Sequence, residues 1–453
     1  MFLPFADRVG QRLGKIVILP ISAHVGLLIV FMLDDHLVAT FLLVAAGFLG
    51  VFLAERQLRE RSQKSVLWLV LAVAFVLRCL LLPLPPSLSG DVERYVWDGR
   101  VLGAGLNPYE LPPEAPELAP LRDSLWEGLQ HRQVPTVYPP LAETLFAISA
   151  SLPASVLTLK TMLVLLDLGT CVLLLVLARI WSLPPERTIW YAWNPLVTVE
   201  IAGMGHVDGL GVALVVLTTT LLALSPEKLG RASIAAAGAV LAKLVPLLAV
   251  PVWGRQSGRT GRFILATLAL SLIGLLPVWI STEGPPPGLI EYGVSWEFNG
   301  PIFEPLWRVL DRLDLQTAVE SGLDRLKEVT GKHDFWNHLY PFNYPQLWAK
   351  AILSLGLLVA LVWSWRTPDT AQSLGRVFGS ILVFSATVYP WYALWVLPWA
   401  ALQRHPAWLT LSGLLFFSYI PRIWDVPLFP WIQALVWLPF VAVMLFGVRW
   451  STR

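Results

Sequence analysis

The stretch SGDVERYVWDGRVLGAGLN, residues 89–107, concentrates charged residues in a chain that has few of them. Only 14% of the 453 residues are charged, yet five charged residues lie between positions 91 and 100. On a helix, Asp91, Arg94 and Asp98 share one face, because they follow each other at intervals of three and four residues. Apolar side chains occupy another side of the same helix: Val92, Val96 and Trp97. The pattern predicts an amphipathic helix at a membrane surface, whose charges are either merely solvated or form an active site at the bilayer edge.

Composition predicts a membrane protein. Hydrophobic residues make up 56% of the sequence, and many apolar runs approach the roughly 20 residues that a spanning helix needs. A soluble protein of this size carries roughly a quarter charged residues. The net charge of +2 comes without a basic patch, so nucleic acid is not an expected partner. We therefore predict an all-α integral membrane protein in which residues 1–453 form a single polytopic domain.

The positive-inside rule assigns the sides of the membrane. Arg8, Arg12 and Lys15 precede the first apolar run, and Arg449 and Arg453 follow the last, so both termini are expected in the cytoplasm. The first run is long for a signal peptide and lacks a clear cleavage site, so we interpret it as a retained span. About twelve crossings satisfy the charges of the loops: residues 16–33, 38–54, 66–84, 156–180, 188–202, 212–224, 263–280, 347–365, 377–388, 393–402, 408–420 and 431–448.

This topology places the opening stretch in a long loop, residues 85–156, on the periplasmic or external side of the plasma (inner) membrane. The same loop contains a second amphipathic piece near residues 118–131. It also contains YPPLAETLFAISASLP (138–153), which predicts a surface helix opened by two prolines.

A second long external loop is expected over residues 281–346, with a polar helix near residues 319–329. Between the two loops, residues 233–253 are flanked by basic residues on both sides. One crossing there would break the charge rule. The sequence therefore favours a re-entrant pair that turns near Lys243 and Pro246.

Charged side chains inside apolar runs cost roughly 2.5–3.5 kcal/mol near the bilayer centre, so they usually face a partner or a cavity. Asp167 is best interpreted as the structural partner of a neighbouring helix. Lys243 either reaches a lipid headgroup or binds a substrate phosphate, and its distance from both ends of its run favours the phosphate. The segment GMGHVDGLG (203–211) has glycines typical of close helix packing, but packing does not require His206 or Asp208. A helix that begins at Asp208 is also a natural anion site.

The sequence gives no sign of a metal site or of a disulfide. Cys79 and Cys171 lie inside apolar runs and are interpreted as small buried hydrophobes. The histidines are scattered, and neither HExxH nor CxxC occurs. Most of the 22 tryptophans fit an interfacial belt, and Trp391 belongs either to that belt or to a sugar site.

External carboxylates beside cations and a glycine break suit a substrate that is part lipid, part anion and part polyol. A sugar carried on a lipid phosphate has this composition, and Lys243, Arg94 or Arg100 would hold its phosphate. A carboxylate would deprotonate the acceptor hydroxyl as it attacks the anomeric carbon. Lipid phosphate leaves as an anion without protonation, so one base suffices and the configuration is inverted.

Five blocks of the chain resemble bacterial polytopic GT-C glycosyltransferases. The chain is similar to glycosyltransferase family 87, to the polyprenol-phosphate-mannose-dependent mannosyltransferases and, more distantly, to the first mannosyltransferase of GPI-anchor synthesis. The blocks follow the order that such enzymes use: DVERYVWDGRVLGAGLNPY (91–109), YPPLAE (138–143), WNPLVTVEIAGMGHVDGLG (193–211), AKLVPLLAVP (242–251) and YPWYALWVLP (389–398). The resemblance implies a GT-C-like bundle whose two long external loops carry amphipathic helices.

In that class an acidic residue of the first large external loop is the catalytic base, and Asp91 stands at the matching position. Many relatives carry two adjacent acids there, whereas this chain has Gly90, so Asp91 acts alone or with Glu93. Val207 replaces the Asn or Gln that commonly precedes the acid of the glycine-rich block, which leaves His206 and Asp208. The resemblance also implies a reaction that needs no metal and no cofactor.

We therefore expect a cell-envelope membrane glycosyltransferase. It moves a hexose, mannose first, from a polyprenyl-phosphate sugar to an unknown lipid or glycan acceptor. Asp91 is the expected base, with Glu93 as support or as the alternative base. The expected phosphate-binding residues are Lys243, Arg94, Arg100 and His206, and the residues expected to position the sugar or acceptor are Tyr138, Asp208 and Trp391.

The sequence admits three other functions. A transporter or flippase for a lipid-linked saccharide would explain the intramembrane charges, but it predicts inverted repeats and broken helices in both halves. A non-catalytic scaffold of an envelope-assembly complex predicts that Asp91→Asn is tolerated. A metal-dependent oligosaccharyltransferase fits less well, because the external carboxylates form no obvious ligand set and no large C-terminal soluble domain is present.

Overall fold

The computed structural model describes residues 3–33, 37–339 and 343–447 and is helical throughout. Within these ranges the only β-structure is a pair of isolated bridges that join Phe298 and Asn299 to Thr387. The predicted all-α class is confirmed. The longer helices of the bundle are α1 (Leu3–Met32), α2 (Leu37–Leu58), α3 (Gln63–Leu81), α7 (Ser155–Ile180), α10 (Asp208–Leu224), α11 (Leu229–Ala242), α13 (Thr260–Ser281), α18 (Pro345–Trp365), α19 (Thr370–Phe384) and α23 (Trp431–Phe446).

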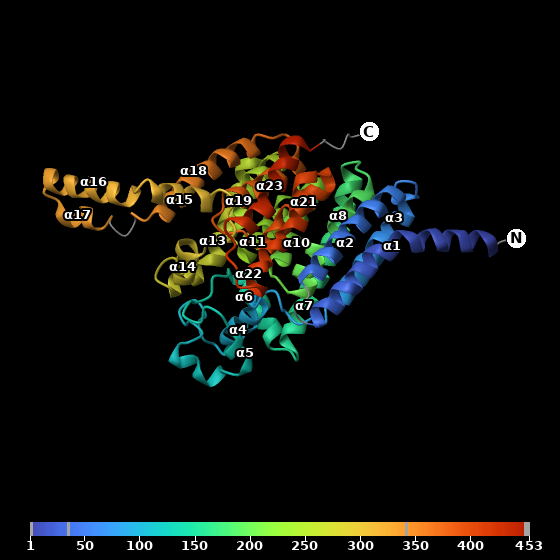
Figure 1. Ribbon diagram of the computed structural model, residues 1–453, viewed down its shortest axis with the longest axis horizontal. Coiled ribbons are helices and arrows are strands. Elements are labelled where there is room, and N and C mark those ends of the chain that lie inside the picture. The colour runs from blue at the N-terminus through green and yellow to red at the C-terminus, as the bar shows by residue number, and fades with distance from the viewer. Residues whose placement is uncertain (1–2, 34–36, 340–342, 448–453) are drawn as a thin grey trace.

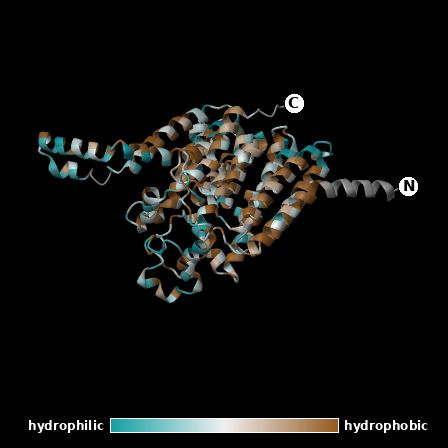
Figure 2. Ribbon diagram, in the orientation of Figure 1, coloured by the Kyte–Doolittle hydropathy of each residue, from teal (hydrophilic) through white to brown (hydrophobic). Residues whose placement is uncertain are grey.

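Five helices of the described chain are long and apolar enough to cross a membrane: α2, α3, α7, α13 and α18. Further apolar helices are shorter, among them residues 16–32 of α1 together with α10, α11 and α23. Figure 2 shows hydrophobic residues along most of the central bundle and hydrophilic residues concentrated in the segments that project from it. An integral membrane protein is therefore supported, whereas the number of twelve crossings stays a prediction.

Several expected crossings are chains of short pieces instead of single helices. Residues 188–202 form α8 (Ile189–Ala192), α9 (Pro195–Thr198) and the π-helical turn η3 (Val199–Gly203). Proline removes a backbone donor and interrupts a helix, and such breaks are tolerated at membrane depth only where protein surrounds them. The other broken crossings contain η6 (Pro390–Trp395), α20 (Leu397–Gln403), α21 (Pro406–Leu414), η7 (Leu415–Tyr419) and α22 (Ile420–Ile423).

The segment around Lys243 reverses direction, as the charge rule predicts. Helix α11 ends at Ala242, Lys243 is extended, and the chain continues in η4 (Val245–Ala249) and α12 (Val250–Gln256). Lys243 binds Asp208 at the beginning of α10, whereas the Trp253 ring nitrogen donates to Thr219 Oγ1 near the end of α10, over 2.9 Å. The two contacts lie at opposite ends of one helix, so the chain goes out along α11 and returns along η4 and α12.

The segment predicted as the first external loop, residues 85–156, packs as a layer against one end of the bundle (Figure 1). Its helices are α4 (Asp91–Gly103), α5 (Ser124–Gly128) and α6 (Pro140–Ala150), together with the 3-10 turn η1 (Pro116–Leu121). The helix predicted from the opening stretch is thus α4, and the helix predicted after the two prolines is α6. The amphipathic piece expected near residues 118–131 is wrong in extent, since only η1 and the five-residue α5 form there.

Helix α4 is packed within the protein and is not a solvated surface helix. A Cβ atom on Gly99 would lie 2.3 Å from the backbone of Phe146, so α4 and α6 can approach this closely only through a glycine. Asp98 is 2% exposed, and Trp97 is fully buried. The interpretation that the charges of this stretch are merely solvated is therefore wrong for Asp98.

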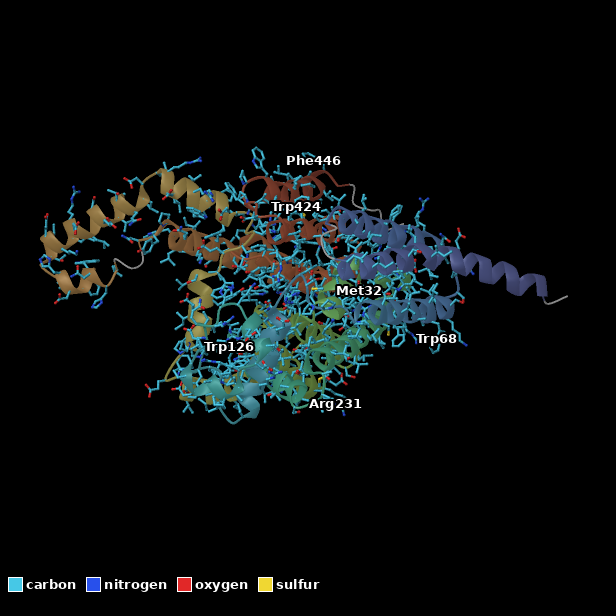
Figure 3. All side chains as sticks on the ribbon, turned by 60° about the horizontal axis from the view of Figure 1, so that its bottom comes forward. Met32, Trp68, Trp126, Arg231, Trp424 and Phe446 are labelled. Carbon is cyan, nitrogen blue, oxygen red and sulfur yellow. The ribbon has the colours of Figure 1, made fainter. Side chains whose placement is uncertain are left out.

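The second external loop begins with α14 (Pro287–Ser295) and continues into an arm that projects from the bundle (Figure 1). The arm contains α15 (Phe303–Arg312), α16 (Leu315–Thr330) and α17 (His333–Asn337). Helix α16 confirms the polar helix expected near residues 319–329. In the all-atom view, Trp126 marks the first external loop and Arg231 marks the start of α11 (Figure 3).

Two arginines connect α2, η2 (Pro185–Thr188) and the end of α20. Arg404 pairs with Glu55 at 2.8 Å, and Arg187 donates to the carbonyl of Leu402. The expected sidedness of the termini depends on basic residues near both ends of the chain. Arg449 and Arg453, and the side chains of Arg8, Arg12 and Lys15, lie outside the described residues.

Candidate active site

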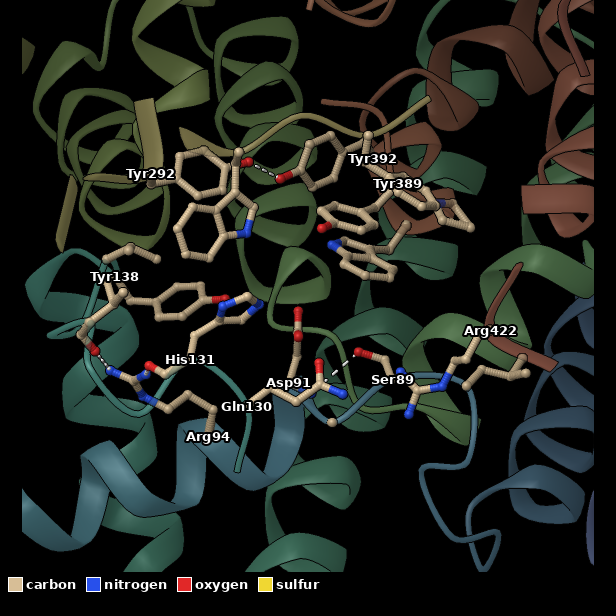
Figure 4. A pocket seen from close by; sticks show the side chains of 18 of the residues that line it. Ser89, Asp91, Arg94, Gln130, His131, Tyr138, Tyr292, Tyr389, Tyr392 and Arg422 are labelled. Carbon is tan, nitrogen blue, oxygen red and sulfur yellow. Dashed lines mark hydrogen bonds between the residues drawn. The ribbon is translucent and has the colours of Figure 1, made fainter. Parts of the chain in front are cut away.

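A cavity of about 370 Å³ opens between the first external loop and the end of the bundle. Figure 4 shows side chains from several distant segments of the chain converging on it. Five of the predicted site residues line its wall: Asp91, Arg94, Tyr138, Lys243 and Trp391. Four others do not line it: Glu93, Arg100, His206 and Asp208. Its volume is within the roughly 300–1,000 Å³ of small-molecule sites.

Asp91 is the first residue of α4 and points into the cavity (Figure 4). Its backbone N–H donates to Ser89 Oγ over 3.2 Å. The Tyr95 hydroxyl faces Asp91 Oδ2 at 3.4 Å, and Tyr138 donates in turn to Tyr95. The side chain is 36% exposed, which leaves the carboxylate open to a substrate.

Enclosure by protein raises the pKa of Asp91 above its ordinary value, because burial disfavours the charged carboxylate. The positive charge of Lys243 acts in the opposite direction and lowers the pKa of Asp91, whereas the negative charge of Asp208 raises it further. A raised pKa makes a carboxylate a stronger base than it is in water. This property suits a group that accepts a proton from a sugar hydroxyl.

His206 lies directly behind Asp91 and is fully buried. Its Nδ1 lies 3.7 Å from Asp91 Oδ2, and its Nε2 lies 3.2 Å from Glu200 Oε2. The imidazole stacks on the Trp391 ring with centroids 3.8 Å apart and planes 16° from parallel. Asp91 and Trp391 line the cavity wall, and His206 lies behind them and does not line it.

Lys243 and Asp208 form an ion pair at the inner end of the cavity. Lys243 Nζ lies 2.8 Å and 2.9 Å from the two carboxylate oxygens, and the Trp395 ring nitrogen donates to Asp208 Oδ1 over 2.6 Å. Asp208 is buried, whereas the Lys243 side chain is 21% exposed and lies above the Tyr392 ring. The cation is therefore available to an anion, while Asp208 is saturated by its partners.

The glycine-rich segment serves both packing and the site, which the sequence left as alternatives. Gly205 has φ +79°, and a Cβ atom there would lie 2.9 Å from both Lys160 and Val92. A Cβ on Gly211 would lie 2.2 Å from Trp395. These two glycines allow the close packing that brings His206 and Asp208 to the base of the cavity.

The arginines of α4 hold loops. Arg94 donates to Asp98 Oδ1 over 2.8 Å and to the carbonyl of Val134 over 2.8 Å, so it fixes the loop that carries His131 (Figure 4). Arg100 donates to Asp123 Oδ2 over 2.7 Å, away from the cavity wall. Neither guanidinium is directed at Asp91.

Glu93 follows Asp91 by two residues and therefore lies on another side of α4. Its Oε2 faces Gly128, within 3.6 Å of where a Cβ atom of that glycine would lie. Partial burial raises its pKa, and the charge of Arg422 opposes the rise. Asp91 is thus the acid of this pair that the cavity exposes.

Several lining residues were not among the predicted site residues. Asp98 belongs to the opening charged stretch, and Tyr389 and Tyr392 belong to the block YPWYALWVLP, so these three had a local signal. Most of the others, among them Arg422, lie in segments that are distant in sequence from that stretch. Tyr292 and Tyr392 are hydrogen-bonded to each other across the cavity (Figure 4). The other unpredicted lining residues with polar groups are Ser89, Asp98, Gln130, His131, Trp296, Tyr389, Ser418 and Tyr419.

A second, apolar cavity of about 230 Å³ adjoins the first and shares part of its wall, including Tyr138, Lys243 and Tyr392. The remainder of its lining is largely aliphatic or aromatic, from η4, α14 and α19. Lys243 therefore stands where a polar cavity and an apolar one meet. In the part of the chain that the structure describes, no three His, Cys, Asp or Glu side chains are grouped as metal ligands.

Comparison with known proteins identifies the family. Residues 17–257, more than half of the chain, match the model of the alpha-(1→6)-mannopyranosyltransferase N-terminal domain. No curated protein and no solved structure matches the chain. The chain belongs to this mannosyltransferase family, and the resemblance to GT-C and family 87 enzymes is confirmed. The matched range includes Asp91, His206, Asp208 and Lys243, whereas Trp391 and Arg422 lie beyond it.

Proposed function

We propose that this protein is an inverting mannosyltransferase that uses a polyprenyl-phosphate mannose donor, with Asp91 as the catalytic base and the active site on the external face. The observation that carries the proposal is the position of Lys243 at the junction of the two cavities. A lipid-phosphate sugar presents a sugar, an anion and an apolar chain in that order. The polar cavity, Lys243 and the apolar cavity offer matching surroundings in the same order.

The donor phosphate binds Lys243 in this proposal, with Arg422 as a second cation of the cavity wall. The isoprenoid chain follows the apolar cavity past Tyr138 and Leu244. The mannose lies between Asp91 and the aromatic wall that Trp391 and Tyr389 form, whose rings are stacked 4.6 Å apart. Arg94, which fixes the loop around His131, positions the wall on the acceptor side.

Asp91 accepts the proton of the acceptor hydroxyl as the oxygen attacks the anomeric carbon. The bond from that carbon to the phosphate oxygen breaks, and its electron pair leaves with the lipid phosphate. Lys243 stabilises the charge that develops on the leaving phosphate. One displacement inverts the anomeric configuration, and no second carboxylate is required.

The external assignment is supported by the distribution of charge. The cavity opens beside α4, whereas the basic loop between α2 and α3 lies at the other end of the bundle (Figure 1). Arg404 pairs with Glu55, near the end of α2 that leads into this loop. Basic loops favour the cytoplasmic side. The cavity would therefore face the periplasm or the cell exterior.

The test uses the purified protein in nanodiscs with EDTA. Radiolabelled polyprenyl-phosphate sugars are offered as donors, with an alkyl α-(1→6)-dimannoside as acceptor, since the family description names that linkage. We expect mannose transfer that falls by about 10²–10⁴-fold in Asp91→Asn, the range for loss of a general base. Glu93→Gln is the matched control and should retain most activity.

Other outcomes would overturn the proposal. Equal turnover by wild type and Asp91→Asn would remove Asp91 as the base, and loss of transfer in Glu93→Gln alone would assign that role to Glu93. Donor binding without turnover in any variant would favour a transporter. Retention of the donor's anomeric configuration in the product would exclude a single displacement.

A further inference from the structure

Glu200 is a buried carboxylate that a substrate in the cavity cannot reach. It lies in the π-helical turn η3, is fully buried and does not line the cavity. The Tyr419 hydroxyl donates to both of its oxygens, over 2.9 Å and 3.1 Å. Burying a carboxylate in a bundle of apolar helices is costly, so its contacts indicate what it is for.

The third contact of Glu200 is His206, which connects it to Asp91. The Nε2 to Glu200 distance is 3.2 Å, close to hydrogen-bond length, whereas the Nδ1 to Asp91 distance is 3.7 Å. Neither ring nitrogen has a hydrogen-bond partner with good geometry within the described ranges, and Nε2 is the one nearer to a carboxylate. A neutral imidazole with its hydrogen on Nε2 would place that hydrogen beside Glu200. The lone pair of Nδ1 then faces the carboxylate of Asp91. Both are hydrogen-bond acceptors, which explains the longer distance of 3.7 Å between them.

This arrangement prepares His206 to accept a proton from Asp91. When Asp91 gains a proton, its hydroxyl can donate to Nδ1 and the long contact closes. An imidazolium would then lie between the anion of Glu200 and the face of Trp391, and both stabilise a cation. Burial lowers the pKa of His206 and is the largest effect that opposes this cation, and the charge of Lys243 acts in the same direction. Asp208 pairs with Lys243 at 2.8 Å.

We infer that Glu200 is a positioning residue of the reaction: through His206, it lets Asp91 pass on the proton that it takes from the acceptor hydroxyl. Tyr419 holds Glu200 in place. The inference rests on the proposed function, since it requires Asp91 to be the base. It adds Glu200 and Tyr419 to the residues that support the reaction. It assigns His206 to proton transfer in place of binding the donor phosphate.

Every bond and proton of the step is accounted for. The acceptor O–H bond breaks, the new carbon–oxygen bond forms, and the bond to the lipid phosphate breaks with its electron pair on the phosphate. The proton moves to Asp91 and then to Nδ1 of His206, while Nε2 keeps its own hydrogen on Glu200. After the product leaves, the proton returns through Asp91 to water in the cavity.

The decisive variant is Glu200→Gln, which keeps the shape of the side chain but cannot supply a negative charge. We expect kcat for mannose transfer to fall roughly 10- to 100-fold, less than the loss of a direct base. The KM for the donor should stay unchanged, because Glu200 does not touch the cavity. Glu186→Gln is the matched control: Glu186 is a buried glutamate of η2 (Pro185–Thr188), far from the site.

The pH profile separates this role from a structural one. The charged groups that face His206 are Asp91, Glu200 and Lys243. Tyr419 contacts Glu200, and Asp208 pairs with Lys243. Removing the negative charge of Glu200 disfavours protonation of the Asp91–His206 unit. The acid limb of kcat should therefore move to lower pH in Glu200→Gln while the plateau falls. A variant that merely loosens the fold lowers the plateau and leaves the limb in place.

Each outcome decides the inference. A wild-type kcat and an unmoved limb in Glu200→Gln, with Asp91→Asn inactive, would overturn the relay and leave the proposed function intact. Activity in Asp91→Asn would overturn both. If Glu200→Gln does not fold, His206→Asn and Tyr419→Phe replace it. His206→Asn should lower kcat as strongly, and Tyr419→Phe should lower it less; wild-type kcat in both would refute the relay.

Discussion

Two buried ion pairs of this bundle have the same charges and different surroundings. Arg78 of α3 pairs with Asp167 of α7 at 2.6 Å, and both side chains are fully buried. Lys243 pairs with Asp208 at 2.8 Å, but Lys243 lines the cavity beside Asp91. The first pair is sealed between helices, and the second is open on its cationic side.

The surrounding polar atoms explain the difference. Arg78 also donates to the carbonyls of Ala74 and Ala192, and the Tyr191 hydroxyl donates to Asp167 over 2.6 Å, so this pair has no capacity left for a ligand. Among the described residues, Lys243 pairs with one carboxylate, that of Asp208, and lies over the face of Tyr392. The comparison indicates that a charge inside the bundle is structural when all its hydrogen bonds are made within the protein. It is functional when one member of the pair can still bind a ligand.

The largest effect is expected at the sealed pair. Arg78→Met leaves Asp167 as an uncompensated buried charge, which should cost about 3–5 kcal/mol of stability. Thermal unfolding in detergent measures the loss. Replacing both partners, as Arg78→Met with Asp167→Leu, should recover much of the stability, because an apolar pair needs no compensation. Failure of the double variant to recover would mean that this pair does more than connect α3 to α7.

The open pair should respond in activity more than in stability. Lys243→Met is expected to lower mannose transfer roughly 100-fold, about 2.7 kcal/mol of transition-state stabilisation, because the developing phosphate charge loses its cation. Asp208 keeps the Trp395 hydrogen bond, so unfolding should shift less than in Arg78→Met. Assays of transfer and of unfolding on the same preparation measure both effects. A Lys243→Met protein with full activity would show that the open cation is not used.

The glycine that precedes the open pair offers a smaller effect. Gly205→Ala should cost about 1–3 kcal/mol, because an alanine at φ +79° is strained and its Cβ meets Val92 of α4. Gly203→Ala is the control, since its Cβ would meet only Val199 at 3.9 Å. Thermal unfolding of the two variants should differ. If both behaved alike, close approach at Gly205 would not be what holds the segment to α4.

The smallest expected effect is a shift in pH dependence. Transfer requires ionised Asp91, so activity falls as pH drops through its raised pKa. Asp91 is faced by Lys243, Asp208, His206 and Tyr95, and Lys243 is the group whose charge lowers that pKa. The acid limb of the residual activity in Lys243→Met should therefore move to higher pH. A limb that moves to lower pH would contradict the assignment of Asp91 as base.

Sequence reasoning named three of the four members of these pairs and missed which residues bind each other. Asp167 was correctly interpreted as the partner of a neighbouring helix, but Arg78 was not singled out in its own apolar run. Lys243 and Asp208 were both predicted as site residues, without a prediction that they bind each other. Contacts between residues 35 or more positions apart leave no periodic signal in a single sequence.

The order of local patterns along the chain determined much of this protein. Hydropathy and loop charge predicted a helical membrane protein and the turn near Lys243, the charged stretch predicted α4, and two prolines predicted the start of α6. These features depend on neighbours within a few residues, where helix periodicity and proline geometry act directly.

Only the tertiary structure decided which polar residues share a cavity. It placed Asp91, Lys243 and Trp391 in one wall, turned Glu93 and Arg100 away, and put His206 between Asp91 and Glu200. Helix rotation and packing distance set these positions, and both depend on contacts such as Gly205 against α4. Residues two positions apart point to different sides of a helix. Asp91 and Glu93 are both acids of the same stretch, but the packing of α4 directs only Asp91 toward the cavity.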